Sequence, residues 1–186
     1  MGLAVIATVD GRVPDALQGT LDLVQNPQDI TAVVQISVLS RDAVPALDFA
    51  RQAWLVESRP QWDGAAGEQR DPSRPVPGIK QVTLLRRAEG IDRGEFARHW
   101  TEVHAPLARR HHPLLWRYRQ NIVVAPLLPG MDDDIDGIAE LGMRLRQDFV
   151  DRMYDSPEGR RVVGADVRQF IDLRRSRQFL TREYTL

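Results

Sequence analysis

The residues best suited to chemistry lie near the end of a predicted helix, where His104 follows Trp100 by four positions. Four residues are about one helical turn, so the two side chains face the same way. Histidine titrates near neutral pH and can accept and donate protons there. His104 is therefore a candidate acid–base or ligand-contacting residue, and Trp100 a candidate wall of the same site. The alternative is a structural histidine that hydrogen-bonds to backbone at the helix end.

Glu140 is the second candidate for proton transfer. It lies in a predicted strand over residues 137–143, where it faces away from its apolar neighbours Ala139 and Leu141. If those neighbours pack on helices, Glu140 points into the protein interior, where burial raises a carboxyl pKa and suits it to acid–base chemistry. Gly142 would widen a pocket beside it. The alternative for Glu140 is an ion pair with one of the many arginines.

Tyr118 and Asn121 could hydrogen-bond to a ligand from a predicted strand over residues 115–124. The two side chains face opposite ways because they are an odd number of residues apart. Alternation does not decide which face meets a cavity, since both faces carry polar and apolar residues. The alternatives are a packing role for Tyr118 and a position at a strand edge or loop end for Asn121.

The histidines do not form a recognisable metal site. His99 and His104 are five residues apart, about 140° around an α-helix, whereas zinc-binding pairs share one face. The chain has no cysteine, which excludes thiolate ligands and disulfides. Glycine-rich nucleotide loops and a serine-hydrolase elbow are also missing from the sequence. We therefore predict neither a metal nor a cofactor.

A segment rich in proline and glycine divides the chain. Residues 59–78 have a composition typical of a surface linker. Residues 79–186 show a βαββαβ pattern, which predicts an antiparallel sheet with helices on one face. Residues 1–58 suggest a truncated, degenerate copy of this ferredoxin-like unit. The predicted strands and short helices of that copy are Leu3–Thr8, Leu17–Val24 (helix), Ala32–Leu39, Ala43–Phe49 (helix) and Arg51–Val56.

Local signals delimit the helices of the second unit. Asp92 and Glu95 form a capping-box pattern at the start of the first helix. Pro106 disfavours helical backbone at the preceding residue, so this helix should end or kink near His104. Ser156 and Pro157 have the residue types of an N-cap followed by the first helical position.

The order of motifs in residues 79–186 resembles the EthD (ethyl tert-butyl ether degradation) family of the dimeric α+β-barrel group. The motifs are Asp92 through Leu107, Tyr118 through Asn121, Asp136 through Glu140, Ser156 through Gly159 and Phe170 through Arg177. The resemblance implies an α+β fold in which two antiparallel sheets meet face to face, close a barrel and enclose a cavity. A second chain or the N-terminal half could supply the second sheet, and a homodimer is expected. It also implies a functional role for His104, which matches a recurrent histidine of the family.

The resemblance implies a cofactor-independent enzyme of oxidoreductase or monooxygenase type, or a related lyase or isomerase. Its substrate would be a small apolar or aromatic compound. In that reading His104 shuttles a proton, Glu140 assists, and Tyr118 and Asn121 anchor the ligand. The alternatives are a non-catalytic binding or accessory protein for a hydrophobic metabolite and, last, a haem protein.

Composition and charge argue against nucleic-acid and membrane partners for this protein. A net charge of −1 without a concentrated basic face argues against nucleic-acid binding. The first apolar run, Leu3–Thr8, is too short for a signal peptide or a membrane span. We therefore expect a cytoplasmic protein with no membrane partner.

Overall fold

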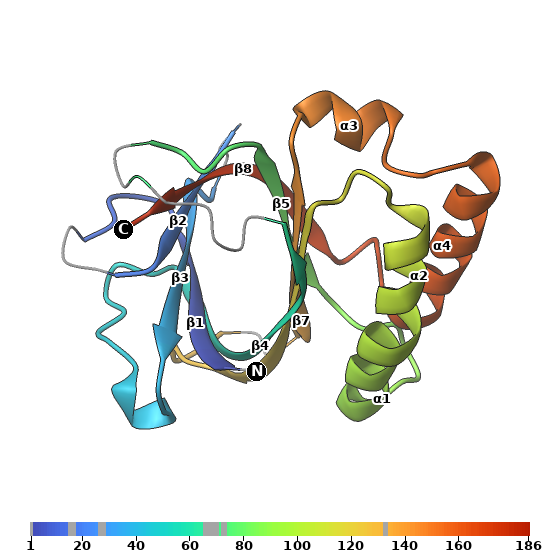
Figure 1. Cartoon of the computed structure of the whole chain (residues 1–186). Helices are drawn as coiled ribbons and strands as arrows, with labels where there is room; N and C mark the ends of the chain where they lie inside the picture. Colours follow the sequence, from blue (N-terminus) through green and yellow to red (C-terminus); the bar gives the residue numbers. More distant parts are fainter. Residues whose placement is uncertain (1, 15–17, 26–28, 65–70, 72–73, 132–133) are drawn as a thin grey trace.

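The computed structural model describes residues 2–14, 18–25, 29–64, 71, 74–131 and 134–186. Within them the strands form one closed antiparallel barrel in the order β1-β3-β2-β8-β5-β7-β6-β4 (Figure 1). The strands are β1 (Gly2–Val9), β2 (Thr20–Val24), β3 (Ala32–Val38), β4 (Gln52–Asp63), β5 (Ile79–Leu85), β6 (Arg117–Pro126), β7 (Gly137–Met143) and β8 (Arg177–Thr185). The helices are η1 (Arg41–Ala43), α1 (Arg93–Arg98), η2 (His99–His104), α2 (Ala105–His111), α3 (Arg146–Asp151) and α4 (Pro157–Phe170).

The two halves of the chain repeat the same strand order. In the N-terminal half the order is β4-β1-β3-β2, and in the C-terminal half it is β8-β5-β7-β6, which is the order of a ferredoxin-like sheet in each case. The halves are joined by two antiparallel ladders, β2 with β8 and β4 with β6. The chain therefore supplies both sheets of its own barrel, and closure requires no second copy.

The N-terminal half differs from the sequence prediction in its helices. The predicted helix Leu17–Val24 is wrong, because Thr20–Val24 is strand β2; residue 17 lies outside the described residues. Its backbone groups bond to β3 on one side and β8 on the other, a ladder that local propensity cannot reveal. The predicted helix Ala43–Phe49 is also wrong, since only the 3₁₀ turn Arg41–Ala43 forms.

Strand β4 extends beyond the expected start of the linker at residue 59. Its pairing with β6 continues to Asp63, opposite Arg117. Pro60 is tolerated because it lies beside a register shift, where a strand can accommodate a residue without an N–H. The boundary drawn from proline and glycine content therefore falls inside a strand.

Helices α1, α2, α3 and α4 cover one face of the C-terminal half-sheet and lie on one side of the barrel (Figure 1). Between them and the sheet lies an apolar cluster that includes Phe96, Trp100, Ala139 and Phe170. The predicted caps are confirmed: the N–H of Glu95 donates to Asp92 Oδ1 at 2.7 Å, and the N–H of Gly159 donates to Ser156 Oγ at 2.9 Å. No helix in the described ranges is long and apolar enough to cross a membrane.

The helix that carries His104 does not end before Pro106. Residues 99–104 form the π-helical turn η2, and α2 then continues to His111. A proline ring clashes with the carbonyl four residues earlier, and the wider π winding moves that carbonyl away. The carbonyl of Trp100 accepts the N–H of Ala105 and also Gln120 Nε2, at 2.8 Å, from the sheet below.

The close approach of this helix to the sheet depends on Gly137. A Cβ atom there would overlap the ring of Trp100 and lie 3.1 Å from the ring of Phe96. We expect Gly137→Ala to cost about 1–3 kcal/mol of unfolding free energy through overpacking. Gly164→Ala is the matched control, because a Cβ on this residue of α4 meets only the end of Arg168, and alanine stabilises a helix interior. Thermal unfolding should show a lower midpoint for the first variant and an equal or higher one for the second.

Candidate functional site

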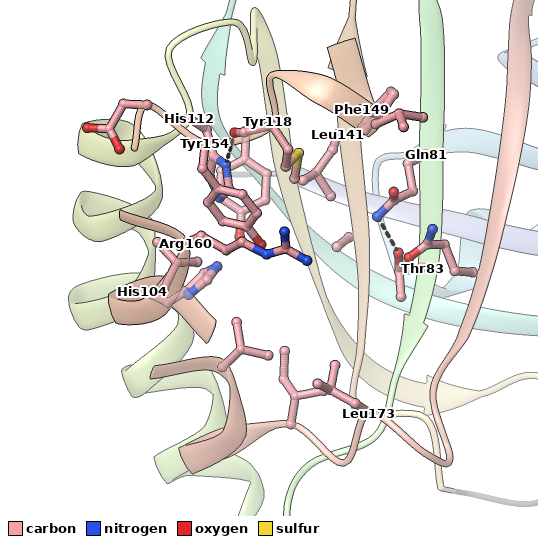
Figure 2. A pocket seen from close by; sticks show the side chains of 18 of the residues that line it. Gln81, Thr83, His104, His112, Tyr118, Leu141, Phe149, Tyr154, Arg160 and Leu173 are labelled. Atoms are coloured by element: carbon pink, nitrogen blue, oxygen red, sulfur yellow. Dashed lines mark hydrogen bonds between the residues drawn. The ribbon is translucent and has the colours of Figure 1, made fainter. Parts of the chain in front are cut away.

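The candidate site is a cavity of about 700 Å³ between the outer face of the C-terminal half-sheet and the helices. Its floor comes from β5, β6 and β7, and its walls come from η2, α3, α4 and the segment between α3 and α4 (Figure 2). The lining includes Gln81, Thr83, Trp100, His104, His112, Tyr118, Leu141, Phe149, Tyr154, Arg160, Val163 and Val167. This volume, with a lining of apolar and polar residues in nearly equal number, suits a small organic ligand that carries polar groups.

The cavity is not between the two half-sheets, where the family resemblance placed it. The barrel interior is filled at one end by an apolar cluster that includes Ile6, Trp54, Val82 and Ile138. At the other end it holds a cluster of buried charges around Lys80. The expectation of a cavity between the sheets is therefore wrong for this chain, and the usable space lies on the opposite face of one sheet.

His104 lies in the wall of the cavity and is held by Asp166 of α4. Its Nδ1 lies 2.7 Å from Asp166 Oδ2, and His99 Nε2 lies 2.8 Å from Oδ1 of the same carboxylate. Five residues complete about one turn of a π-helix, so η2 brings the two histidines to one side. The expectation that they face apart is wrong because it assumed α-helical geometry.

The His104–Asp166 pair fixes which nitrogen of His104 is available. Burial alone would raise the pKa of Asp166, but the hydrogen bonds from His104 and His99 hold it below its ordinary value. The carboxylate is therefore an acceptor, and His104 Nδ1 must donate to it. In the neutral ring Nε2 then carries the lone pair, the arrangement by which a carboxylate orients a general base.

Tyr118 presents an unused hydroxyl hydrogen at the same cavity. Its oxygen accepts hydrogen bonds from Trp100 Nε1, at 2.7 Å, and from Gln120 Nε2, at 3.1 Å. Two donors occupy both lone pairs of the oxygen, and the described residues offer no acceptor for its hydrogen. Burial raises the pKa of Tyr118 above its ordinary value, so the group stays protonated. Tyr118 can therefore donate to a ligand oxygen.

His112 also lines the cavity, although the sequence predicted no ligand-binding role for it. Its Nδ1 donates to the carbonyl of Met153 at 2.7 Å, and its ring packs on Tyr154 with centroids 4.9 Å apart. Burial lowers the pKa of His112, which favours the neutral ring. Asp166, 62 residues from His104 along the chain, is the other residue that was missed, because no local pattern marks it.

Glu140 and Asn121 do not reach the cavity. As predicted from alternation, Glu140 points into the barrel, but it meets Lys80 Nζ at 3.0 Å and Asn121 Nδ2 at 2.8 Å rather than an open pocket. Burial pushes the pKa of Glu140 upward, but the charges of Lys80 and Arg119 bring it below its ordinary value. The predicted raised pKa is therefore wrong. The widening expected at Gly142 is also wrong, because the side chains of Arg117 and Trp116 fill that space.

The buried charges around Lys80 link the two halves of the barrel. Lys80 Nζ contacts Asp22 of β2 at 2.7 Å, Glu183 of β8 at 2.7 Å and Glu140 of β7 at 3.0 Å. Arg117 adds a second contact to Glu183 at 3.1 Å. Burial raises the pKa of Asp22 to about 6, whereas the charges of Lys80 and Arg117 overcome burial and lower that of Glu183 to about 2.

These opposite pKa shifts predict that Glu183 and Asp22 contribute to the free energy of unfolding in opposite ways as pH changes. A carboxyl with a depressed pKa stabilises the fold above its unfolded value of 4.5, and loses this contribution as pH falls towards 2. The stability difference between the wild type and Glu183→Gln should therefore be largest above pH 4.5 and shrink below it. Asp22→Asn is the control of opposite sign. The raised pKa of Asp22 stabilises the fold below its unfolded value of 3.8, and this contribution is lost as pH rises through about 6. Urea unfolding midpoints from pH 2 to 7 would measure both; a constant Glu183→Gln difference would contradict the assignment.

Comparison with known proteins agrees with this architecture. Residues 88–174 match the EthD domain, and this span contains Trp100, His104, Tyr118 and Asp166. The chain contains an EthD domain. A crystal structure described as that of an anthrone oxidase-like protein superposes with a TM-score of 0.59 over 99% of this chain and 93% of the other, at 12% identity. At that identity the EthD-like α+β barrel is shared, and the likeness carries no statement about activity. Among proteins of curated function, none matches this chain.

Proposed function

We propose that the cavity binds a small apolar or aromatic molecule and that His104 removes a proton from it. The observation that carries this proposal is the His104–Asp166 pair in the wall of the cavity, which leaves Nε2 as a base. Carboxylate-oriented histidine is the arrangement used by many general bases. Glu140 and Asn121 have structural roles in this proposal, and Trp100 positions Tyr118 through its hydrogen bond.

The anion formed by proton removal would be stabilised by Tyr118. A substrate whose acidic C–H is conjugated with a carbonyl, directly or through an aromatic ring, places negative charge on oxygen when it is deprotonated. The free hydroxyl hydrogen of Tyr118 can donate to that oxygen, and such a donor in a site shielded from water stabilises developing charge strongly. The side chains would thus lower the barrier to forming an electron-rich enolate.

The favoured outcome is an oxidase-type reaction with dioxygen as the oxidant. An enolate can reduce dioxygen directly, and a methylene next to a ring system then becomes a ketone while one water is released. A protein described as anthrone oxidase-like shares the fold, and for that reason we propose testing an oxidase-type reaction before isomerisation. No cofactor is required by this proposal, since the enolate itself supplies the electrons.

Anthrone is a suitable probe because its methylene lies between two aromatic rings that conjugate it with a ketone, so that loss of a proton places negative charge on the ketone oxygen. The purified protein is incubated with anthrone in air, and dioxygen uptake and ketone formation are followed together. We expect enzyme-dependent uptake with one dioxygen consumed per ketone formed. Binding of anthrone without uptake or isomerisation would contradict an enzymatic role and favour a binding or accessory protein.

A further inference from the structure

Arg160 places a positive charge in the wall of the cavity, and no carboxylate among the described residues forms an ion pair with it. It lies in the first turns of α4, and its guanidinium extends into the cavity near Tyr154 (Figure 2). On a helix, side chains three and four residues away are its neighbours. At Arg160 these are Ser156, Pro157, Val163 and Gly164, none of which is acidic.

The adjacent arginine shows the contrast. Arg161 does not line the cavity and forms a two-pronged ion pair with Glu158, with distances of 2.9 and 2.6 Å. The two carboxylates that line the cavity are already engaged: Asp155 with His111 and Ser156, and Asp151 with Gln147. Within the described part of the chain, Arg160 forms no ion pair.

The position of Arg160 is not explained by helix stability. The N-terminal end of a helix carries a partial positive charge and favours acidic residues, so an arginine close to it is mildly unfavourable. The helix end and the guanidinium together favour negative charge in this part of the cavity. Guanidinium groups bind carboxylates through two parallel hydrogen bonds, which also fixes the orientation of the bound group.

We propose that the ligand of this cavity is an aromatic acid whose carboxylate pairs with Arg160 while its ring system lies against Tyr118, His112 and Tyr154. This inference deepens the proposed function by naming the substrate class. Arg160 would determine specificity, because it orients the ring so that an acidic C–H can approach His104. A neutral molecule of the same shape would lack this orientation.

The test compares two probes of nearly equal shape, anthracene-2-carboxylate and anthracene-2-carboxamide, by fluorescence titration. We expect the wild type to bind the carboxylate about tenfold more tightly than the amide, because a charge-assisted pair at a partly exposed site gives about this discrimination. Arg160→Ala should abolish the preference while leaving amide affinity within about threefold. Arg161→Ala is the matched control and should retain the preference. Added salt should reduce it in the wild type, since the pair is partly exposed.

Equal binding of the two probes by the wild type would overturn the inference, as would an Arg160→Ala variant that keeps the preference or failure of both probes to bind. These outcomes are separable from those of the proposed reaction, because binding needs no turnover and anthrone carries no carboxylate. Dioxygen uptake with anthrone but no carboxylate preference would leave the reaction standing and refute the role of Arg160. A carboxylate preference that depends on Arg160, without dioxygen uptake with anthrone, would retain the acid-binding site and refute the reaction.

Discussion

Replacing Lys80 with methionine is expected to lower the free energy of unfolding by about 3–5 kcal/mol, the usual cost of removing one partner from a buried ion pair. The cost should be this large because three buried carboxylates form ion pairs with the Lys80 ammonium group. Asp22, Glu140 and Glu183 all lie within 3.0 Å of its ammonium nitrogen, and all four side chains are buried. Methionine has a similar length, so the loss of charge rather than of volume should dominate the result.

Urea unfolding at pH 7 measures this effect, and acidification tests its cause. Without Lys80 the remaining carboxylates repel one another, so the folded state should take up protons more readily and the deficit should shrink as pH falls from 7 to 5. The double variant Lys80→Met with Asp22→Asn should be less destabilised than the sum of the two single variants. Arg161→Met, which removes an exposed ion pair, is the control and should change stability little. A small, pH-independent effect of Lys80→Met would show that the cluster does not hold the halves together.

Replacing His104 with alanine is expected to reduce turnover of a substrate such as anthrone by about 10²–10⁴-fold, the usual contribution of a general base. Ligand affinity should change only a few-fold, because most of the cavity wall is formed by other residues. Steady-state dioxygen uptake gives the rate, and fluorescence titration gives the dissociation constant. A loss confined to turnover is the signature of a group that acts in the transition state.

His99→Ala is the matched control for this variant. His99 bonds to the same carboxylate as His104 but does not line the cavity. We expect a much smaller loss of turnover, since the bond between His104 and Asp166 remains. If both variants lose activity equally, the histidines serve to hold η2 against α4 rather than to transfer a proton. If the two variants also lose the same amount of stability, that structural explanation is confirmed.

Several features of this protein are determined by sequence alone, because they depend on residues close together in the chain. Asp92 and Ser156 cap their helices, and short side-chain-to-backbone bonds at fixed spacing are enough to do this. Alternation along residues 137–143 correctly placed Glu140 towards the interior and Ala139 towards the helices. The run of motifs in residues 79–186 was enough to indicate the EthD family and its α+β barrel, and the matching EthD domain covers residues 88–174.

Other features were decided by contacts between distant parts of the chain. Strand β2 forms because β3 and β8 offer it backbone partners, although its own residues also suit a helix. The π-helical turn forms where Pro106 and Gln120 both act on one stretch of helix, and it brings His99 and His104 to one carboxylate. Spacing rules for an α-helix could not anticipate that meeting.

The location of the site was likewise fixed only by tertiary structure. The N-terminal strands close the barrel and fill its interior, so Glu140 meets Lys80 and its pKa falls instead of rising. The open space lies instead where the helices stand off the outer face of the sheet, with His104, Tyr118 and Arg160 around it. The pKa of a side chain and the position of a cavity both depend on all the residues packed nearby, including residues distant in the sequence. The sequence therefore marked His104 as a candidate for proton transfer, whereas only the fold determined its partner, Asp166, and the cavity it lines.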